Sequence, residues 1–311
     1  MIGDDAGVKR AGVALLAPLA ILAAACRTEP PPAPAPREAA SASARPPSER
    51  PVRFVHAPKA PAGPTPLVLV LHGYGGDARD ADGYFELGAM AEREGLVVVV
   101  PDGTIDSTGS RFWNAVDGCC DFEKRGVDDV AYLAGLVDDA AKRFPIDPAR
   151  VYAVGLSNGG AMAMRLACDA SERFAAVVSV AGPFYADPER CKPKVPVAVR
   201  HVHGTSDRIV PFAGGLPPPG LHPNARVRFP GAEDVTAAWA RRNGCGKPAA
   251  AGPAFDFDGA VAGAETTATR WEGCARGADV ELWRMEGSAH VPRPLRFGET
   301  TLAFLRAHAR K

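Results

Sequence analysis

The sequence has no excess charge of either sign. Lysine and arginine together number 36, as do aspartate and glutamate, so the formal net charge at pH 7 is zero. Proteins that bind nucleic acid usually carry a basic face, because much of their affinity comes from contacts with phosphates. The composition therefore predicts no nucleic acid among the partners of this protein.

The sequence also lacks an apolar run long enough to stay in a membrane as a spanning helix. The apolar stretch at 11–25 is shorter than the about 20 residues that such a helix needs. Two basic residues precede this stretch and small residues lead from it to Cys26, an order typical of a signal for export. We therefore predict that residues 1–26 direct export.

The end of this signal resembles the processing site of bacterial lipoproteins, in which a cysteine carries lipid. Ala24 and Ala25 precede Cys26, although Ala23 stands where leucine is usual. We expect lipid on Cys26 to be the only attachment of the protein to a membrane. An ordinary secretory signal, which would leave the protein secreted or periplasmic, is the alternative.

Residues 27–50 have few large apolar side chains. Proline and alanine supply 13 of these 24 residues, so the segment cannot bury enough apolar surface to fold. We predict a disordered linker at 27–50, with a plain tail as the alternative, followed by a globular catalytic domain at 51–311.

Apolar runs and amphipathic segments alternate along this domain. The apolar runs lie at 67–73, 96–103, 151–156, 175–182, 195–204 and 280–287, and the helical patterns lie at 127–144, 232–243 and 299–310. Continuous apolar runs are typical of strands that are covered on both faces. Their alternation with helices predicts an α/β fold with a mainly parallel central sheet and helices on both faces.

Ser157 stands in the segment VGLSNGG, directly after the apolar run at 151–156. A strand that enters a helix through the pattern Gly-x-Ser-x-Gly makes a sharp turn that exposes the serine above the sheet. Gly155 and Gly159 are small enough for the helix to pack closely against the strand. We predict that Ser157 is a nucleophile; an incidental serine in a glycine-rich turn is the alternative.

A serine nucleophile needs a base, and the base needs an acid to orient it. In α/β-hydrolases their order is serine, acid, histidine, and Asp207 follows an apolar run where its carboxylate could reach the sheet edge. Of the histidines after it, His222 lies in a loop rich in proline and glycine and His308 lies on the last helical segment, whereas His290 follows the last predicted strand. We therefore choose Asp207 as the acid, rather than as a residue of a local turn, and His290 as the base.

The oxyanion of an acyl-transfer intermediate is best stabilised by backbone N–H groups that are fixed in advance. The segment LHGYGGD at 71–77 follows the first strong strand, and its glycines let the backbone turn its amides inward. We assign one donor to Tyr74 and the other to Asn158, the residue after the nucleophile. His72 is expected to brace this loop, and His201 and His203 are expected to support the end of their strand.

Seven segments occur in an order that is typical of one enzyme family. They are LHGYGGD, WNAVDGCCD, VDDVAYL, GLSNGGAMAMRLAC, HGTSDRIVPF, AAWARRNGCG and the last histidine segment, EGSAHVP. Over residues 51–310 the sequence resembles the exported polyhydroxybutyrate-depolymerase and feruloyl-esterase-like family of α/β-hydrolases. The resemblance implies ester hydrolysis by Ser157, Asp207 and His290, with neither a metal nor an organic cofactor.

The substrate is less closely indicated than the reaction. Members of that family commonly carry GGGH-x-W-P, whereas this sequence has EGSAHVPRP and lacks a tryptophan that could pack against substrate. We expect Trp113 and the segments 104–126 and 213–231 to border the cleft, with packing as the alternative. No long apolar helix resembles a lipase lid, so we predict an open, shallow cleft for short-chain, hydroxyalkanoate, aromatic or polysaccharide-linked esters.

Two other functions remain open. The first is a hydrolase-fold lipoprotein that binds a ligand or a cell-wall partner without turnover, and the complete order of serine, acid and histidine argues against it. The second is a peptidase on the same fold, although nothing in the sequence indicates peptide recognition.

Six cysteines remain after Cys26, an even number that suggests disulfide bonds in an exported protein. They are Cys119, Cys120, Cys168, Cys191, Cys245 and Cys274. Metal binding is the alternative, but no Cys-x-x-Cys or Cys/His spacing supports it. We expect Cys119 and Cys120 to bond to different partners, because a bridge between neighbours is strained, and we favour Cys245–Cys274 as a pair.

Overall fold

A computed structural model describes residues 50, 52–61, 63–219 and 226–311. These residues belong to the second of two units, which spans residues 45–311. The predicted export signal, nearly all of the predicted linker, and His222 lie outside the described residues. None of the helices in the described part of the chain is long and apolar enough to cross a membrane.

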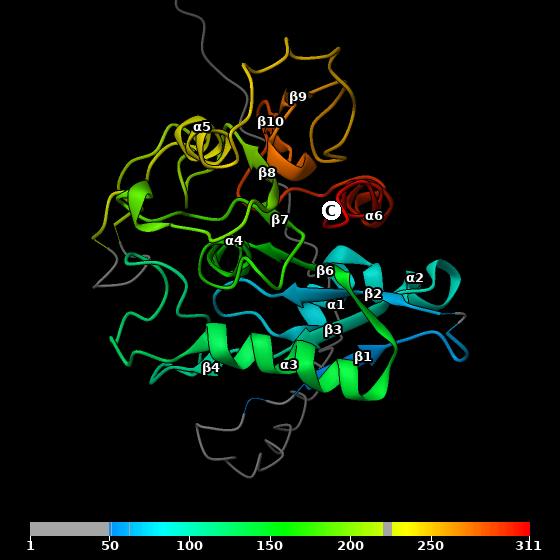
Figure 1. Cartoon of the computed structure of the whole chain (residues 1–311). Helices are drawn as coiled ribbons and strands as arrows, with labels where there is room; N and C mark the ends of the chain where they lie inside the picture. Colours follow the sequence, from blue (N-terminus) through cyan, green and yellow to red (C-terminus); the bar gives the residue numbers. More distant parts are fainter. Residues whose placement is uncertain (1–49, 51, 62, 220–225) are drawn as a thin grey trace, which may run out of the picture. The chain divides into compact units, whose positions relative to one another are not determined.

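An eight-stranded sheet forms the centre of the domain (Figure 1). In spatial order its strands are β1 (Val52–His56), β3 (Val97–Pro101), β2 (Thr65–Leu71), β6 (Ile146–Leu156), β7 (Ala176–Val180), β8 (Ala198–Gly204), β10 (Val280–Met285) and β9 (Thr266–Trp271). All strands between the two edges run parallel, whereas β1 and β9 pair antiparallel with their neighbours. The predicted mainly parallel sheet is therefore confirmed.

Helices follow most of the inner strands. The described α-helices are α1 (Ala78–Phe85), α2 (Leu87–Glu94), α3 (Asp129–Arg143), α4 (Asn158–Asp169), α5 (Ala232–Arg242) and α6 (Phe297–Ala307). Two short 3₁₀ helices lie at Pro188–Arg190 and Ala275–Gly277, and a small ribbon pairs β4 (Thr104–Ile105) with β5 (Arg111–Phe112). The helix predicted at 299–310 thus begins and ends a little earlier than expected.

Side chains of the inner strands alternate between two apolar cores. On β2, Leu67 and Leu69 lie in the core that also holds residues of α3, α4 and α5, whereas Val68 and Val70 lie in the core with residues of α1, α2 and α6. Successive residues of a strand point to opposite faces, so a strand covered on both sides must be apolar throughout. This double coverage explains the continuous apolar runs in the sequence.

Candidate active site

Ser157 lies in a sharp turn between the end of β6 and the first residue of α4. Its backbone angles are φ 55° and ψ −118°, a conformation that residues other than glycine rarely adopt. Its N–H donates to the carbonyl of Val180 on the neighbouring strand at 2.7 Å. A Cβ on Gly159 would come within 2.3 Å of the carbonyl oxygen of Leu71, so only glycine lets the helix start this close to the sheet.

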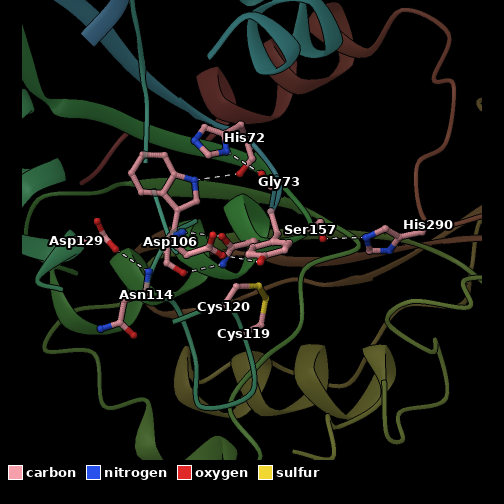
Figure 2. The surroundings of a disulfide bond; sticks show 12 residues. His72, Gly73, Asp106, Asn114, Cys119, Cys120, Asp129, Ser157 and His290 are labelled. Carbon is pink, nitrogen blue, oxygen red and sulfur yellow. Dashed lines mark hydrogen bonds between the residues drawn. A yellow bond between two sulfur atoms is a disulfide. The ribbon is translucent and has the colours of Figure 1, made fainter. Parts of the chain in front are cut away.

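The structure brings together the three residues chosen from the sequence. The Ser157 hydroxyl donates to His290 Nε2 at 2.8 Å (Figure 2). In turn, His290 Nδ1 donates to Asp207 Oδ2 at 2.7 Å. Ser157 follows β6, Asp207 follows β8 and His290 follows β10. Because the carboxyl ends of parallel strands meet at one edge of the sheet, residues 133 positions apart become neighbours. His308 lies elsewhere, at the end of α6, against the carbonyl of Phe304.

Asp207 is held in place by four donors. Its Oδ1 accepts from the backbone N–H groups of Ile209 and Val210 at 2.8 and 2.9 Å, and its Oδ2 accepts from His290 and His203. Burial raises the pKa of Asp207, but the hydrogen bonds from His203 and His290 outweigh burial and hold the pKa well below its usual range. The carboxylate is therefore ionised and fixed in orientation.

His203 was expected only to support the end of its strand, and its contact with Asp207 was not predicted. Its Nε2 lies 3.1 Å from Asp207 Oδ2 and 2.8 Å from the carbonyl of Val210, so this nitrogen carries the proton. Its Nδ1 faces Nε2 of His201 at 3.0 Å. Burial lowers the pKa of His201 well below its usual value. The neutral His201 ring therefore lies next to His203, on the side away from Asp207. The signal in the sequence was the spacing of His203, four residues before Asp207.

The loop after β2 lies beside Ser157. A Cβ on Gly73 would lie 3.5 Å from Ser157 Cβ, which brings the backbone at Tyr74 close to the serine. Asn158 is the first residue of α4, and the N–H groups of a first helical turn have no partner within their helix. The two amides that the sequence suggested as oxyanion donors thus flank Ser157.

His72 braces this loop. Gly103 N–H donates to its Nε2 at 2.9 Å, so the proton is on Nδ1, which donates to the carbonyl of Gly73 at 2.7 Å. Burial lowers the pKa of His72, a shift that favours the neutral ring these two bonds require.

Trp113 does not border the cleft. Its side chain is fully buried, and its indole N–H donates to the carbonyl of His72 at 3.0 Å. Its backbone N–H donates to Asn158 Oδ1 at 2.7 Å, and Asn158 Nδ2 donates to its carbonyl at 2.9 Å. The expectation that Trp113 contacts substrate is wrong, and packing, the alternative, describes its place.

Three disulfides join the six cysteines. Cys245–Cys274 is bonded, as favoured from the sequence, and a second bridge joins Cys168 to Cys191. The third joins the neighbours Cys119 and Cys120, so the expectation of different partners for these two is wrong. This bridge lies at the end of a tight turn, in which Val116 and Cys119 exchange backbone hydrogen bonds of 2.9 and 3.0 Å.

A small apolar cavity adjoins Ser157, and we call it the Ser157 pocket. It has a volume of about 30 Å³. Most of its wall is apolar or sulfur-bearing, with contributions from Tyr74, Cys119, Cys120, Phe122, Val210 and Phe229. Within the described part of the chain, no cluster of three or more His, Cys, Asp or Glu residues could hold a metal ion. The pocket can thus receive a small apolar group next to a serine hydroxyl.

Residues 85–206 match the prolyl oligopeptidase family. The matched part runs from the end of α1 to just beyond β8 and includes Ser157. It ends one residue before Asp207 and does not include His290.

Matches to individual proteins say more about the family of this chain than the match at residues 85–206. NocK from Nocardia uniformis subsp. tsuyamanensis, described as an esterase, is 33% identical over 66% of this chain and 66% of its own length. Feruloyl esterase B from Piromyces equi is 27% identical over 73% of this chain and 39% of its own. Poly(3-hydroxybutyrate) depolymerase from Ralstonia pickettii is 36% identical over 40% of this chain and 27% of the depolymerase. The chain belongs to the polyhydroxybutyrate-depolymerase and feruloyl-esterase-like family of α/β-hydrolases.

The matched segments of this α/β-hydrolase span at most about two thirds of the lengths of those relatives. Among solved structures, acetyl xylan esterase from Aspergillus awamori superposes with a TM-score of 0.56 at 15% identity, over 81% of this chain and 93% of the esterase. At that identity the likeness establishes the α/β-hydrolase fold alone.

Proposed function

We propose that this protein is an exported serine esterase. Ser157 is the nucleophile, His290 the general base and Asp207 the acid that orients His290. The observation that carries this proposal is the unbroken chain of hydrogen bonds from Ser157 Oγ through the His290 ring to Asp207. The relatives described as esterases favour the same class of reaction.

The mechanism follows from the direction of these hydrogen bonds. As Ser157 Oγ attacks the ester carbonyl, His290 Nε2 takes its proton, and the Asp207 carboxylate stabilises the charged ring. The backbone N–H groups of Tyr74 and Asn158 stabilise the oxyanion of the tetrahedral intermediate. Collapse of the intermediate breaks the C–O bond, and His290 gives its proton to the departing alcohol. Water, deprotonated by His290, then releases the acid from the acyl-enzyme.

The substrates that we propose are carboxylic esters with short or compact acyl groups. The Ser157 pocket is small and mostly apolar, which suits an acyl group better than a charged or long substituent. The names of the relatives refer to feruloyl esters and to poly(3-hydroxybutyrate), so polymeric and polysaccharide-linked esters belong among the candidates. This chemistry requires neither a metal nor an organic cofactor.

The alternative proposals differ in what they do to an ester. A ligand-binding lipoprotein of the same fold would leave esters and serine-directed probes unchanged. A peptidase, the activity to which the matched family name refers, would cleave proline-containing peptides faster than esters.

Labelling with a fluorophosphonate and hydrolysis of 4-nitrophenyl acetate test the proposal together. We expect the purified wild-type chain to do both and Ser157→Ala to do neither, with a loss of about 10⁶-fold in kcat, the scale for removing such a nucleophile. Ser206→Ala, at an exposed serine beside Asp207, is the matched control and should retain both. Equal ester turnover by Ser157→Ala and wild type would refute the assignment, and peptide cleavage without ester cleavage would favour the peptidase.

Export and lipid attachment are a separate part of the proposal, and they rest on residues 1–26. We expect the full chain, expressed in a bacterium, to enter the membrane fraction and to incorporate labelled fatty acid. Cys26→Ser should lose the label and leave the membrane fraction, because the Cys26 thiol is the group to which we propose that the lipid is attached. Unchanged fractionation of Cys26→Ser would instead leave an ordinary signal peptide or another anchor.

A further inference from the structure

The loop that carries the Cys119–Cys120 disulfide contributes to two hollows of very different character. The disulfide lines the Ser157 pocket, together with Phe122 and Phe229. Other residues of the loop line a groove of about 710 Å³, whose charged side chains include Asp117, Asp121, Arg165 and Arg190. The loop at 114–122 therefore supplies wall to both a small apolar pocket and a large polar groove.

The position of this wall is tied to the nucleophile. The side chain of Asn158, the residue after Ser157, makes two hydrogen bonds to the backbone of Trp113. The carbonyl of Trp113 in turn accepts from Cys120 N–H at 3.3 Å. The two sulfur atoms are thus fixed relative to the serine hydroxyl by a short, buried path.

A second segment closes the wall. Gly118 packs so tightly against the segment after the Pro/Gly-rich loop that a Cβ there would lie 2.6 Å from the Phe229 ring and 2.8 Å from Val227 Cβ. Phe229 itself exchanges backbone hydrogen bonds with Gly215 at 2.8 and 2.9 Å. Gly118, the residue before the disulfide, and Phe229 therefore meet without space for an added methyl group.

We infer that the Cys119–Cys120 disulfide is the wall that limits the length of the acyl group in the Ser157 pocket. This inference rests on the proposed esterase function and adds to it the structure that selects the substrate. With about 30 Å³ free, the pocket has room for little more than two water-sized groups. A longer acyl chain must displace the sulfur atoms, and each methylene misfit in an apolar pocket changes kcat/KM by about 10- to 200-fold.

Two variants move the wall in opposite directions. Cys119→Ala/Cys120→Ala removes the sulfur atoms from the pocket wall and the constraint between them, which enlarges the pocket. Gly118→Ala adds a methyl group to a wall that has no space for it beside Phe229, which narrows the pocket while both cysteines stay in place. Cys168→Ala/Cys191→Ala removes a bridge that does not line the pocket, and it serves as the control for a general loosening of the fold.

The measurement is kcat/KM for 4-nitrophenyl acetate, butanoate and octanoate, per active site titrated with a fluorophosphonate. We expect the octanoate-to-acetate ratio to rise at least about 10-fold in Cys119→Ala/Cys120→Ala, the butanoate-to-acetate ratio to fall in Gly118→Ala, and both ratios to stay constant in the control. Unchanged ratios in the first two variants would overturn the inference while leaving the esterase proposal intact. If the cysteine variant does not fold, Cys119→Ser/Cys120→Ser takes its place, and an unchanged octanoate-to-acetate ratio there overturns the inference. A wild-type chain that neither labels nor cleaves esters would refute the proposed function itself.

Discussion

Replacing Asp207 by asparagine separates the part of this carboxylate in catalysis from its part in stability. The carboxylate accepts from four N–H groups, two of the backbone and two of histidine rings. An asparagine offers one oxygen, which can keep the backbone donors of Ile209 and Val210. Its NH₂ group then faces His203 and His290.

The cost to stability is small because the rings of His203 and His290 can each form another hydrogen bond. His203 Nε2 still donates to the carbonyl of Val210 at 2.8 Å, and His290 can move its proton from Nδ1 to Nε2 and accept from the new NH₂ group. We therefore expect a loss of about 1–3 kcal/mol in the free energy of unfolding, the range for weakening hydrogen bonds to a buried charged group. The cost to catalysis is large, because a proton on Nε2 faces Ser157 and prevents that nitrogen from accepting the proton of the hydroxyl. Such a change of tautomer lowers kcat by about 10⁴-fold in a serine protease, or about 5 kcal/mol of activation free energy.

Urea denaturation and hydrolysis of 4-nitrophenyl acetate measure the two effects on one preparation. Asp147→Asn is the matched control: this aspartate lies near the start of β6, away from Ser157, and accepts from Ala149 N–H and Arg150. It should keep wild-type kcat. A variant Asp207→Asn with kcat within about 10-fold of wild type would refute the role given to the carboxylate.

Acid titration gives the same residue a third test. The folded-state pKa of Asp207 lies below the about 3.9 of an unfolded aspartate, so its ionised form stabilises the fold above pH 4. This contribution disappears as the pH falls through the folded-state value. The stability of wild type should therefore drop more steeply than that of Asp207→Asn between about pH 4 and pH 2, and parallel curves would contradict the ionised, hydrogen-bonded carboxylate.

Three further changes test the support of the site. Asn158→Ala leaves the backbone N–H of buried Trp113 unpaired and removes one of two donors to its carbonyl, so we expect the free energy of unfolding to fall by about 1–3 kcal/mol; an unchanged free energy of unfolding in urea would count against it. Gly159→Ala brings a Cβ within 2.3 Å of the Leu71 carbonyl oxygen, and should lower stability by more than about 3 kcal/mol, which a near-native melting temperature would contradict. Burial keeps the pKa of His201 below the 6.5 of an unfolded histidine, so wild type should lose up to about 1.4 kcal/mol per pH unit below pH 6.5. His201→Asn should therefore lose less unfolding free energy than wild type between pH 7 and pH 5, when unfolding is measured at both pH values.

The residues of the proposed catalytic site could be chosen from the sequence because their signals are local. Ser157 lies between two glycines at the end of an apolar run, and Asp207 and His290 each follow such a run. In a parallel sheet the ends of these runs must meet at one edge, so the order of strands along the chain was enough to bring the three residues together. The same reasoning predicted the inner strands, whose burial on both faces makes them apolar throughout.

The elements that were missed depend on contacts that the sequence does not display. The edge strands β1 and β9 mix polar and apolar residues, and no continuous apolar run marks them. Trp113 resembles a cleft residue in the sequence, but its place is set by hydrogen bonds to His72 and Asn158, which are 41 and 45 positions away. Bonding between Cys119 and Cys120 likewise cannot be inferred from the number of cysteines, which is compatible with any pairing of the six.

Asn158 connects the proposed chemistry to the proposed selection of the acyl group. Its backbone N–H belongs to the first turn of α4, beside the Ser157 hydroxyl, and its side chain holds Trp113, from which the loop with the disulfide extends. A shift of that loop must therefore pull on the residue that supplies an oxyanion donor. For this reason a misfitting acyl chain should lower kcat as well as raise KM, because the strain it places on the sulfur atoms is transmitted to the position where the transition state is stabilised.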